Sequence, residues 1–181
     1  MGYDEKTGIG LLKKYKIRDE KIKHCINVAK ISRFLAQKLK EKGIKINESL
    51  VYFSAIVHDI GYLPGSTEKQ RINHAKIGAE ILKKEGFENV YDIVLKHDIK
   101  YWLSEKYKPS SWEEKIVNYS DSREKNGIVS LNKREKKLIE FLPEAKEWLT
   151  KAFKEVLNFE KELFDLLGMN PDDLKKFVRL D

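Results

Sequence analysis

The stretch Ser54-Ala55-Ile56-Val57-His58-Asp59-Ile60-Gly61 joins an apolar segment to two side chains that can bind a metal ion. The run from Leu50 to Val57 is almost wholly apolar, and the glycine three residues after His58 predicts the end of a helix. Burying an imidazole and a carboxylate beside a core is costly unless a partner satisfies them. Side by side, these two groups are natural ligands of a divalent metal ion. We therefore expect the rest of the chain to bring further ligands to this point.

The composition is that of one compact and highly charged protein. The chain has 181 residues, of which 41% are hydrophobic and 36% charged, so it is too apolar for disorder and long enough for a real core. Its one cysteine excludes an internal disulfide and fits a reducing cytoplasm, where we expect the protein to work. No apolar run is long enough to cross a membrane. The net charge of +7 comes from lysines spread along the whole chain, which indicates a solvated surface rather than a nucleic-acid site.

Apolar residues recur at helical spacing along the chain, and no segment alternates with a period of two. The sequence therefore predicts an all-α fold. A short helix is expected within residues 1–17, and further helices over 18–42, 47–59, 73–84, 90–95 and 111–121. The helix before His58 is apolar nearly all round, so we place it at the centre of the fold. Residues 62–66 form a turn-rich loop and a candidate flap, and residues 100–111 are expected to be a loop.

A C-terminal helical extension is expected after Gly127, where the composition changes. Nine apolar residues follow alternating steps of four and three, a heptad pattern, namely Leu138, Leu142, Ala145, Leu149, Ala152, Val156, Phe159, Leu163 and Leu166. Pro143 interrupts the pattern and is expected to start a helix. Phe141, Trp148, Phe153 and Phe164 widen the apolar face, which favours packing onto the domain over a dimer seam. We expect residues 1–127 to form one domain, with its core at about 18–124. Residues 128–181 would pack on it or serve a homodimer.

The other candidate ligands each lie near the end or the first turn of a different expected helix. Together with the central pair the set is His24, His58, Asp59, His74, His97 and Asp121, and it uses all four histidines of the chain. Helical folds build metal sites by aiming one such side chain from each of several helices at a common point. Single members also have structural explanations, because a histidine at a helix C-terminus, such as His97, suits the helix dipole. Cys25 is interpreted as a small core residue.

The ordered pattern resembles the HD-domain superfamily of metal-dependent phosphohydrolases over about residues 18–124. The residues from His58 to Gly61 match its HDIG variant letter for letter, and His74 and His97 resemble the two additional histidines of its binuclear members. The resemblance implies an HD-domain helical bundle with two divalent ions, drawn from Fe, Mn, Co, Ni and Zn. One ion would take His24, His58, Asp59 and Asp121, and the other Asp59, His74 and His97, with Asp59 as the bridge.

The resemblance also implies that a metal-bound hydroxide hydrolyses a phosphomonoester or phosphodiester of a nucleotide-like substrate, with His58 and Asp59 as catalytic residues. Two alternatives stay open, a di-iron oxygenase of HD type and a non-catalytic nucleotide- or nucleic-acid-binding module. Many binuclear relatives continue HDIG with a phosphate-binding lysine, but this chain has Tyr62 there. Other cations near the ligands are therefore expected to bind phosphate, namely Arg71, Lys100 and Arg123. The expected partner is a phosphorylated small molecule, foremost a nucleotide, and neither a membrane nor a nucleic acid.

Overall fold

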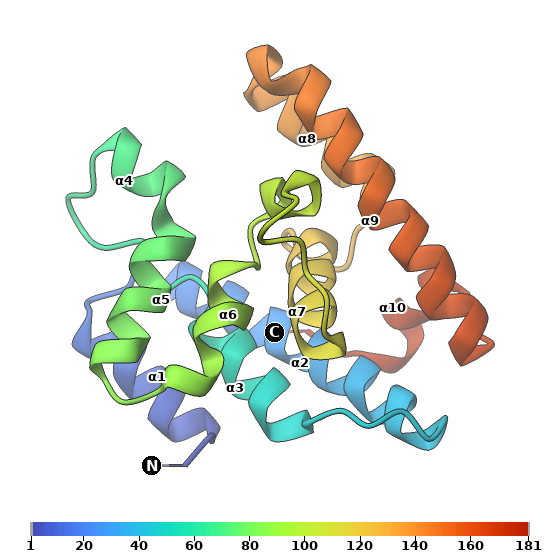
Figure 1. Cartoon of the computed structure of the whole chain (residues 1–181), viewed down its shortest axis with the longest axis horizontal. Coiled ribbons are helices and arrows are strands. Elements are labelled where there is room, and N and C mark those ends of the chain that lie inside the picture. Colours follow the sequence, from blue (N-terminus) through green and yellow to red (C-terminus); the bar gives the residue numbers. More distant parts are fainter. Residues whose placement is uncertain (1, 181) are drawn as a thin grey trace.

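The computed structural model describes residues 2–180, and within that range it consists of helices without a β-strand (Figure 1). The all-α prediction is therefore confirmed. The elements are α1 (Glu5–Lys14), α2 (Asp19–Glu41), α3 (Glu48–Val57), α4 (Glu68–Ile72), α5 (His74–Lys84), η1 (Glu88–Val90), α6 (Tyr91–Leu95), η2 (Ile99–Leu103), α7 (Trp112–Arg123), α8 (Leu131–Phe141), η3 (Pro143–Ala145), α9 (Lys146–Leu167), η4 (Pro171–Asp173) and α10 (Leu174–Phe177). No helix within the described range is both long and apolar enough to cross a membrane.

Helix α3 lies at the centre of the packing, as its apolar sequence predicts. It contacts α1, α2, α6 and α7, and every residue from Phe53 to Val57 is buried. The side-chain oxygen of Asn47 caps the helix by accepting a hydrogen bond from the backbone N–H of Leu50 at 3.0 Å. Because the helix ends at Val57, His58 and Asp59 follow it inside the core, and their residual exposures are 0% and 3%. The fold therefore buries two polar groups at the end of its most apolar helix.

The ends of four other helices surround this point. His24 lies in the second turn of α2, and His74 is the first residue of α5. His97 follows the last turn of α6, and Asp121 lies in the last turn of α7. Each of these positions agrees with the helix expected from the sequence. Since an end position lets a side chain project along the helix axis as well as sideways, four elements can reach one small volume.

Gly61 permits a close approach of α5 to the segment that carries Asp59. A Cβ atom added at Gly61 would lie 2.0 Å from the backbone oxygen of His74 and 2.8 Å from the backbone nitrogen of Gly78. Such distances are too short for any side chain, so only glycine fits. The helix ends before Gly61, as expected, but Gly61 is not among the glycines with positive φ. Its role is to let His74 approach the central pair.

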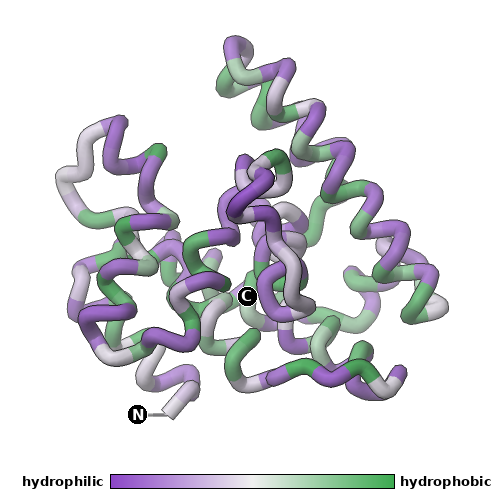
Figure 2. The backbone as a smooth tube through the Cα atoms, in the orientation of Figure 1, coloured by the Kyte–Doolittle hydropathy of each residue, from purple (hydrophilic) through white to green (hydrophobic). Residues whose placement is uncertain are grey.

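The chain after Gly127 forms a hairpin of α8 and α9, which project together away from α4 and α5 (Figure 1). Helix α9 returns along η2 and α7, and the ring of Phe159 contacts Trp102, Trp112 and Tyr119. Figure 2 shows apolar and polar residues alternating along α9, as one buried and one solvated face require. A homodimer through these helices stays a prediction, as does the division of the chain at residue 127.

The heptad pattern expected for this region, which Pro143 interrupts, holds along most of α9, where Leu149, Ala152, Val156, Phe159 and Leu163 are buried. Four residues that were expected on the apolar face are exposed, namely Phe141, Leu142, Trp148 and Leu166, whereas Leu167 is buried. The chain breaks into η3 at Pro143 before α9 begins, so the residues before and after the break do not share one stripe. The buried face of α9 packs on η2 and α7, in agreement with the expected packing onto the domain.

Two short helices were not expected from the sequence. The segment 100–111 begins within η2, and the Asp98 carboxylate accepts a hydrogen bond from the backbone N–H of Lys100 at its start. Helix α4 follows the loop 62–66 and begins with a capping box between Thr67 and Gln70. Both elements span only 5 residues, which is too short for a helical period to show in the sequence.

Candidate metal centre

The structure brings together all six side chains that the sequence singled out as metal ligands. Three groups of three have ligand atoms within 4.8 Å of one another, and one of them joins the buried Cys25 to His58 and Asp59. The other two are made of the predicted ligands alone, His24, His58 and Asp121 in one and Asp59, His74 and His97 in the other. We call them the α2 group and the α5 group. The members come from α2, α5 and α7 and from the ends of α3 and α6. Convergence from five elements makes a local structural role for each residue a poor explanation of the whole set.

Asp59 belongs to the α5 group but also faces the α2 group. It turns one carboxylate oxygen toward the histidines of each group. Its Oδ1 lies 3.5 Å from Nε2 of His74 and 3.5 Å from Nε2 of His97. Its Oδ2 lies 3.6 Å from Nε2 of His24 and 3.5 Å from Nε2 of His58. A carboxylate placed in this way can bind a cation through each oxygen, so it is suited to bridge two sites.

The four histidines point the same ring nitrogen into the site because their Nδ1 atoms are held elsewhere. In three of them Nδ1 lies within hydrogen-bonding distance of the carbonyl oxygen three residues earlier, at 2.6 Å for His58, 2.8 Å for His74 and 2.6 Å for His97. Nδ1 of His24 instead contacts the carboxylate of Glu124. A carbonyl oxygen can only accept, so these rings carry a proton on Nδ1, and Nε2 is the nitrogen that they turn toward a metal ion.

Three ring nitrogens of this site are placed so that a cation could bind to them. Nε2 of His58 is fully buried and has no hydrogen-bond partner in the described chain. Nε2 of His74 lies 3.0 Å from Nε2 of His97, although both rings hold a carbonyl oxygen with Nδ1. Two neutral rings in this tautomer aim lone pairs at each other, which is unfavourable unless a cation lies between or beside them. Imidazole and carboxylate donors fit a divalent transition-metal ion.

Both aspartates are ionised near neutral pH, so each offers a negatively charged oxygen to a cation. Burial alone would raise the pKa of Asp59, but the charges of His58 and Lys21 hold it well below its usual range. Burial acts in the same way on Asp121, and the neighbouring imidazoles of His24 and His58 outweigh it, so the pKa of Asp121 is also well below its usual range. Two buried carboxylates in one small volume attract a divalent cation.

The histidines of the two groups differ in their readiness to bind a metal ion. Burial lowers the pKa of His24, but the carboxylates of Asp121 and Glu124 outweigh it and raise that pKa to about 9. Burial and the neighbouring ring of His97 lower the pKa of His74 to about 4. Near pH 7, therefore, His74 is already neutral, whereas His24 must lose a proton before it can bind a metal ion.

Two charged residues of the site were not expected from the sequence. Glu124, which is 3% exposed, holds Nδ1 of His24 from the end of α7. Lys21 reaches the shared carboxylate, and its Nζ lies 2.6 Å from Oδ2 of Asp59. Each stands three residues from a ligand, Lys21 before His24 and Glu124 after Asp121, and residues three apart share a helix face. This spacing is the signal that would have identified both.

Asn118 of α7 holds the backbone on both sides of His97. Its Nδ2 donates to the carbonyl oxygens of Lys96 at 2.9 Å and Asp98 at 3.3 Å, and its Oδ1 accepts from Nε1 of Trp102 at 2.6 Å. Asn118 is completely buried, so these contacts are not shared with solvent. The amide therefore fixes the position from which His97 enters the site.

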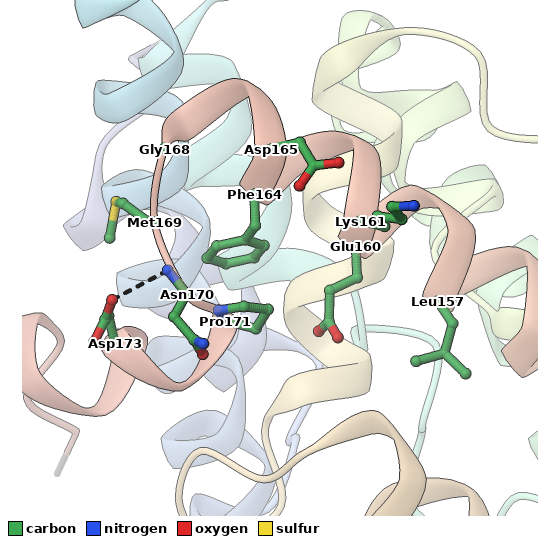
Figure 3. A pocket seen from close by; sticks show the side chains of 10 residues that line it. All are labelled: Leu157, Glu160, Lys161, Phe164, Asp165, Gly168, Met169, Asn170, Pro171 and Asp173. Carbon is green, nitrogen blue, oxygen red and sulfur yellow. Dashed lines mark hydrogen bonds between the residues drawn. The ribbon is translucent and has the colours of Figure 1, made fainter.

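The position of Arg123 gives no support to the prediction that it binds phosphate. Its side chain is 1% exposed, and its guanidinium group donates to the carboxylate of Glu160, the hydroxyl of Tyr119 and the carbonyl oxygen of Val129. Figure 3 shows Glu160 among the residues that line a cavity of about 760 Å³ between α9 and η4. None of the six candidate ligands lines this cavity. Arg123 therefore joins α7 to α9 and does not face the site.

The other two expected phosphate contacts lie near the site without facing it. Nζ of Lys100 pairs with the Asp98 carboxylate at 2.9 Å and donates to the carbonyl oxygen of Ile72 at 2.7 Å. Arg71 is exposed, and its carbonyl oxygen holds Nδ1 of His74. Their contacts explain how the start of α5 is fixed, and they give no support to a role in binding phosphate.

Comparison with known proteins agrees with this geometry. A family model described as "HD domain" matches residues 22–126. An uncharacterized protein of Methanocaldococcus jannaschii is 29% identical over 56% of this chain and 64% of its own length. Two proteins named tRNA (cytidine(56)-2'-O)-methyltransferase match nearly the whole chain. The one from Thermoplasma volcanium is 31% identical over 94% of the chain, and the one from Picrophilus torridus is 29% identical over 96%.

The chain spans about half the length of the two methyltransferases and less than two thirds of the M. jannaschii protein. No solved structure gives a significant match. The matched family region contains all six candidate ligands together with Glu124.

Proposed function

Because the chain belongs to the HD-domain family, we propose that it is a phosphohydrolase that uses two divalent metal ions. One would be bound by His24, His58, Asp59 and Asp121, and the other by Asp59, His74 and His97. The observation that carries this proposal is the position of Asp59, whose two oxygens face separate pairs of histidines at 3.5–3.6 Å. A single ion would need only one of these oxygens.

The residues of the chain have defined tasks in this proposal. A pair of divalent ions in such a site supplies a water of lowered pKa and neutralises charge on a phosphate oxygen. Asp59 holds both positions at a fixed separation, and His58 provides a buried nitrogen with no competing partner. Glu124 holds the ring of His24, and Asn118 holds the backbone around His97. All four histidines are engaged in this way, so none serves as a separate general base.

The proposed substrate is a phosphomonoester or phosphodiester of nucleotide type. The two relatives named as tRNA methyltransferases add RNA to the compounds that deserve testing, since the chain matches half of each of them. A di-iron oxygenase of HD type is the second candidate, because the same nitrogen and oxygen donors suit iron. The two candidates differ in what they consume, which is water in the first and oxygen in the second.

The test uses purified protein that has been stripped of metal and reloaded separately with Mn²⁺, Co²⁺, Zn²⁺ or Fe²⁺. Phosphate release is measured on a panel of phosphomonoesters, nucleotides, dinucleotides and short RNAs, and oxygen uptake is measured with Fe²⁺. We expect Asp59→Asn to abolish turnover and to reduce the bound metal, as measured by elemental analysis. Asp92→Asn is the matched control, because Asp92 is an exposed aspartate on α6.

Retained phosphate release in Asp59→Asn would refute the proposed mechanism. Oxygen uptake by the iron-loaded protein, with no phosphate released from any compound, would replace the hydrolase with the oxygenase. A loss of activity in Asp92→Asn equal to that in Asp59→Asn would show that the loss does not arise at the shared carboxylate.

A further inference from the structure

Lys21 contacts the shared carboxylate from the mouth of the site. It lies on α2 three residues before His24, so the two side chains project from the same face of the helix. Its Nζ lies 2.6 Å from Oδ2 of Asp59, the oxygen that faces the α2 group. The Lys21 side chain is 30% exposed, whereas that of Asp59 is 4% exposed. The ammonium group therefore stands between the buried carboxylate and the solvent.

A metal ion in the α2 group would compete with this ammonium group. Both cations would use Oδ2 of Asp59, and His24 and His58 already face that oxygen at 3.6 and 3.5 Å. Like charges this close together repel each other, and the repulsion is stronger beside a protein than in bulk water. The ion has histidine ligands to hold it, whereas Lys21 has a flexible side chain. We therefore expect the metal ion to displace the ammonium group of Lys21 from Asp59. The displaced ammonium group would then need another anion as its partner.

The ring of Tyr62 keeps the ammonium group close to the site. Nζ of Lys21 lies 4.1 Å from the centroid of this ring, which is a cation–π contact. The same ring stacks on the imidazole of His74, with centroids 4.1 Å apart and planes at 25°. Tyr62 thus connects Lys21 to the α5 group. An ammonium group released from Asp59 would therefore still have the ring of Tyr62 as a neighbour beside the site.

We propose that Lys21 binds an anionic phosphoryl oxygen of the substrate, exchanging the Asp59 carboxylate for it once metal is bound. This inference rests on the proposed function and names the cation that would bind the substrate. An ammonium group offers three donors to phosphate oxygens. Two other candidates are already engaged, Lys100 with Asp98 and Arg123 with Glu160. Lys21 alone of these three contacts a candidate metal ligand and is also open to solvent.

The test compares Lys21→Met and Lys21→Arg with Lys23→Met, which removes the same charge from an exposed position on the same helix. Two titrations are measured by calorimetry, Mn²⁺ into metal-free protein and orthophosphate into Mn²⁺-loaded protein. We expect Lys21→Met to bind Mn²⁺ at least as tightly as the wild type, because the competing ammonium group is gone. It should bind orthophosphate about 10- to 100-fold more weakly. Lys21→Arg and Lys23→Met should remain within a few-fold of the wild type.

Three results would overturn the role of Lys21. The first is that Lys21→Met binds orthophosphate as tightly as the wild type does. The second is that the Mn²⁺-loaded wild type does not bind orthophosphate. The third is that Lys21→Met loses as much Mn²⁺ affinity as Asp59→Asn does. The last would mean that the ammonium group only holds the carboxylate in place. The hydrolase is judged separately. If the protein cleaves no phosphoester but Lys21→Met still binds orthophosphate more weakly than the wild type, the proposed hydrolase activity is refuted. The role of Lys21 in binding an anion is then supported.

Discussion

Metal binding by the α2 group is expected to be strongly pH-dependent, whereas binding by the α5 group is not. In the metal-free protein Asp121 and Glu124 raise the pKa of His24 to about 9, against the effect of burial. His24 therefore carries a proton at pH 7, and that proton must leave before Nε2 can bind a metal ion. In the α5 group burial and His97 lower the pKa of His74 to about 4, so no proton competes for His74 at pH 7.

The size of the effect follows from the pKa of His24. At pH 7 a group with a pKa of about 9 is neutral in about 1% of molecules, which weakens metal binding about 100-fold, or by about 2.7 kcal/mol. Raising the pH from 6.5 to 8.5 should therefore strengthen binding in the α2 group by at least about tenfold per pH unit. His58 adds to the slope, because burial lowers its pKa but the charge of Asp59 outweighs burial and holds that pKa well above its usual value. Binding in the α5 group should change little over this range, because His74 titrates far below it.

The assay is calorimetry with Mn²⁺ at several pH values, in two buffers of different ionisation enthalpy, so that released protons are counted. Glu124→Gln is the test variant, because it removes one of the carboxylates that favour the protonated ring. It should release fewer protons near pH 7 and show a shallower pH dependence. Glu140→Gln, at an exposed position of α8, is the control and should match the wild type. The reasoning would be refuted if the Mn²⁺ affinity of both groups did not depend on pH. It would also be refuted if Glu124→Gln showed the same dependence of Mn²⁺ affinity on pH as the wild type.

Three further predictions concern residues that support the site. Arg123→Met should lower the free energy of unfolding by about 3–5 kcal/mol in urea titrations, since it leaves Glu160 without its buried partner. Asn118→Ala should weaken metal binding in the α5 group about 10- to 100-fold by calorimetry, because it frees the backbone around His97. Gly61→Ala should destabilise the fold by about 1–3 kcal/mol or more in thermal unfolding, because the added Cβ collides with backbone of α5.

Each of these changes has an internal control. Lys151→Met removes an exposed ion pair of α9 and should cost less than about 1 kcal/mol, so an equal effect in Arg123→Met would contradict its buried role. Gly10→Ala meets no atom within 4 Å and should stabilise α1 by about 0.5–1 kcal/mol, in contrast to Gly61→Ala. Equal weakening of both metal groups in Asn118→Ala would show a general loss of structure instead of a local one.

The sequence alone predicted those helices whose residues recur at helical spacing over several turns. Helical spacing and the Asn47 cap define α3, and its apolar surface places it in the core. The short elements α4 and η2 escaped prediction because each contains only 5 residues. The role of Gly61 escaped it for another reason. That glycine is needed because α5 passes close by, and nothing in the neighbouring sequence shows which element will do so.

The sequence by itself determined which residue types stand at the helix ends, and these are the six side chains that the structure brings together. Only the tertiary structure decided which oxygen of Asp59 faces which histidines, and that Lys21 rather than Arg123 lies at the site. The physical reason is the range of the interactions. The helical period fixes neighbours three or four residues apart, whereas the partner of Arg123 lies 37 residues further along the chain and is selected by how α9 packs on α7.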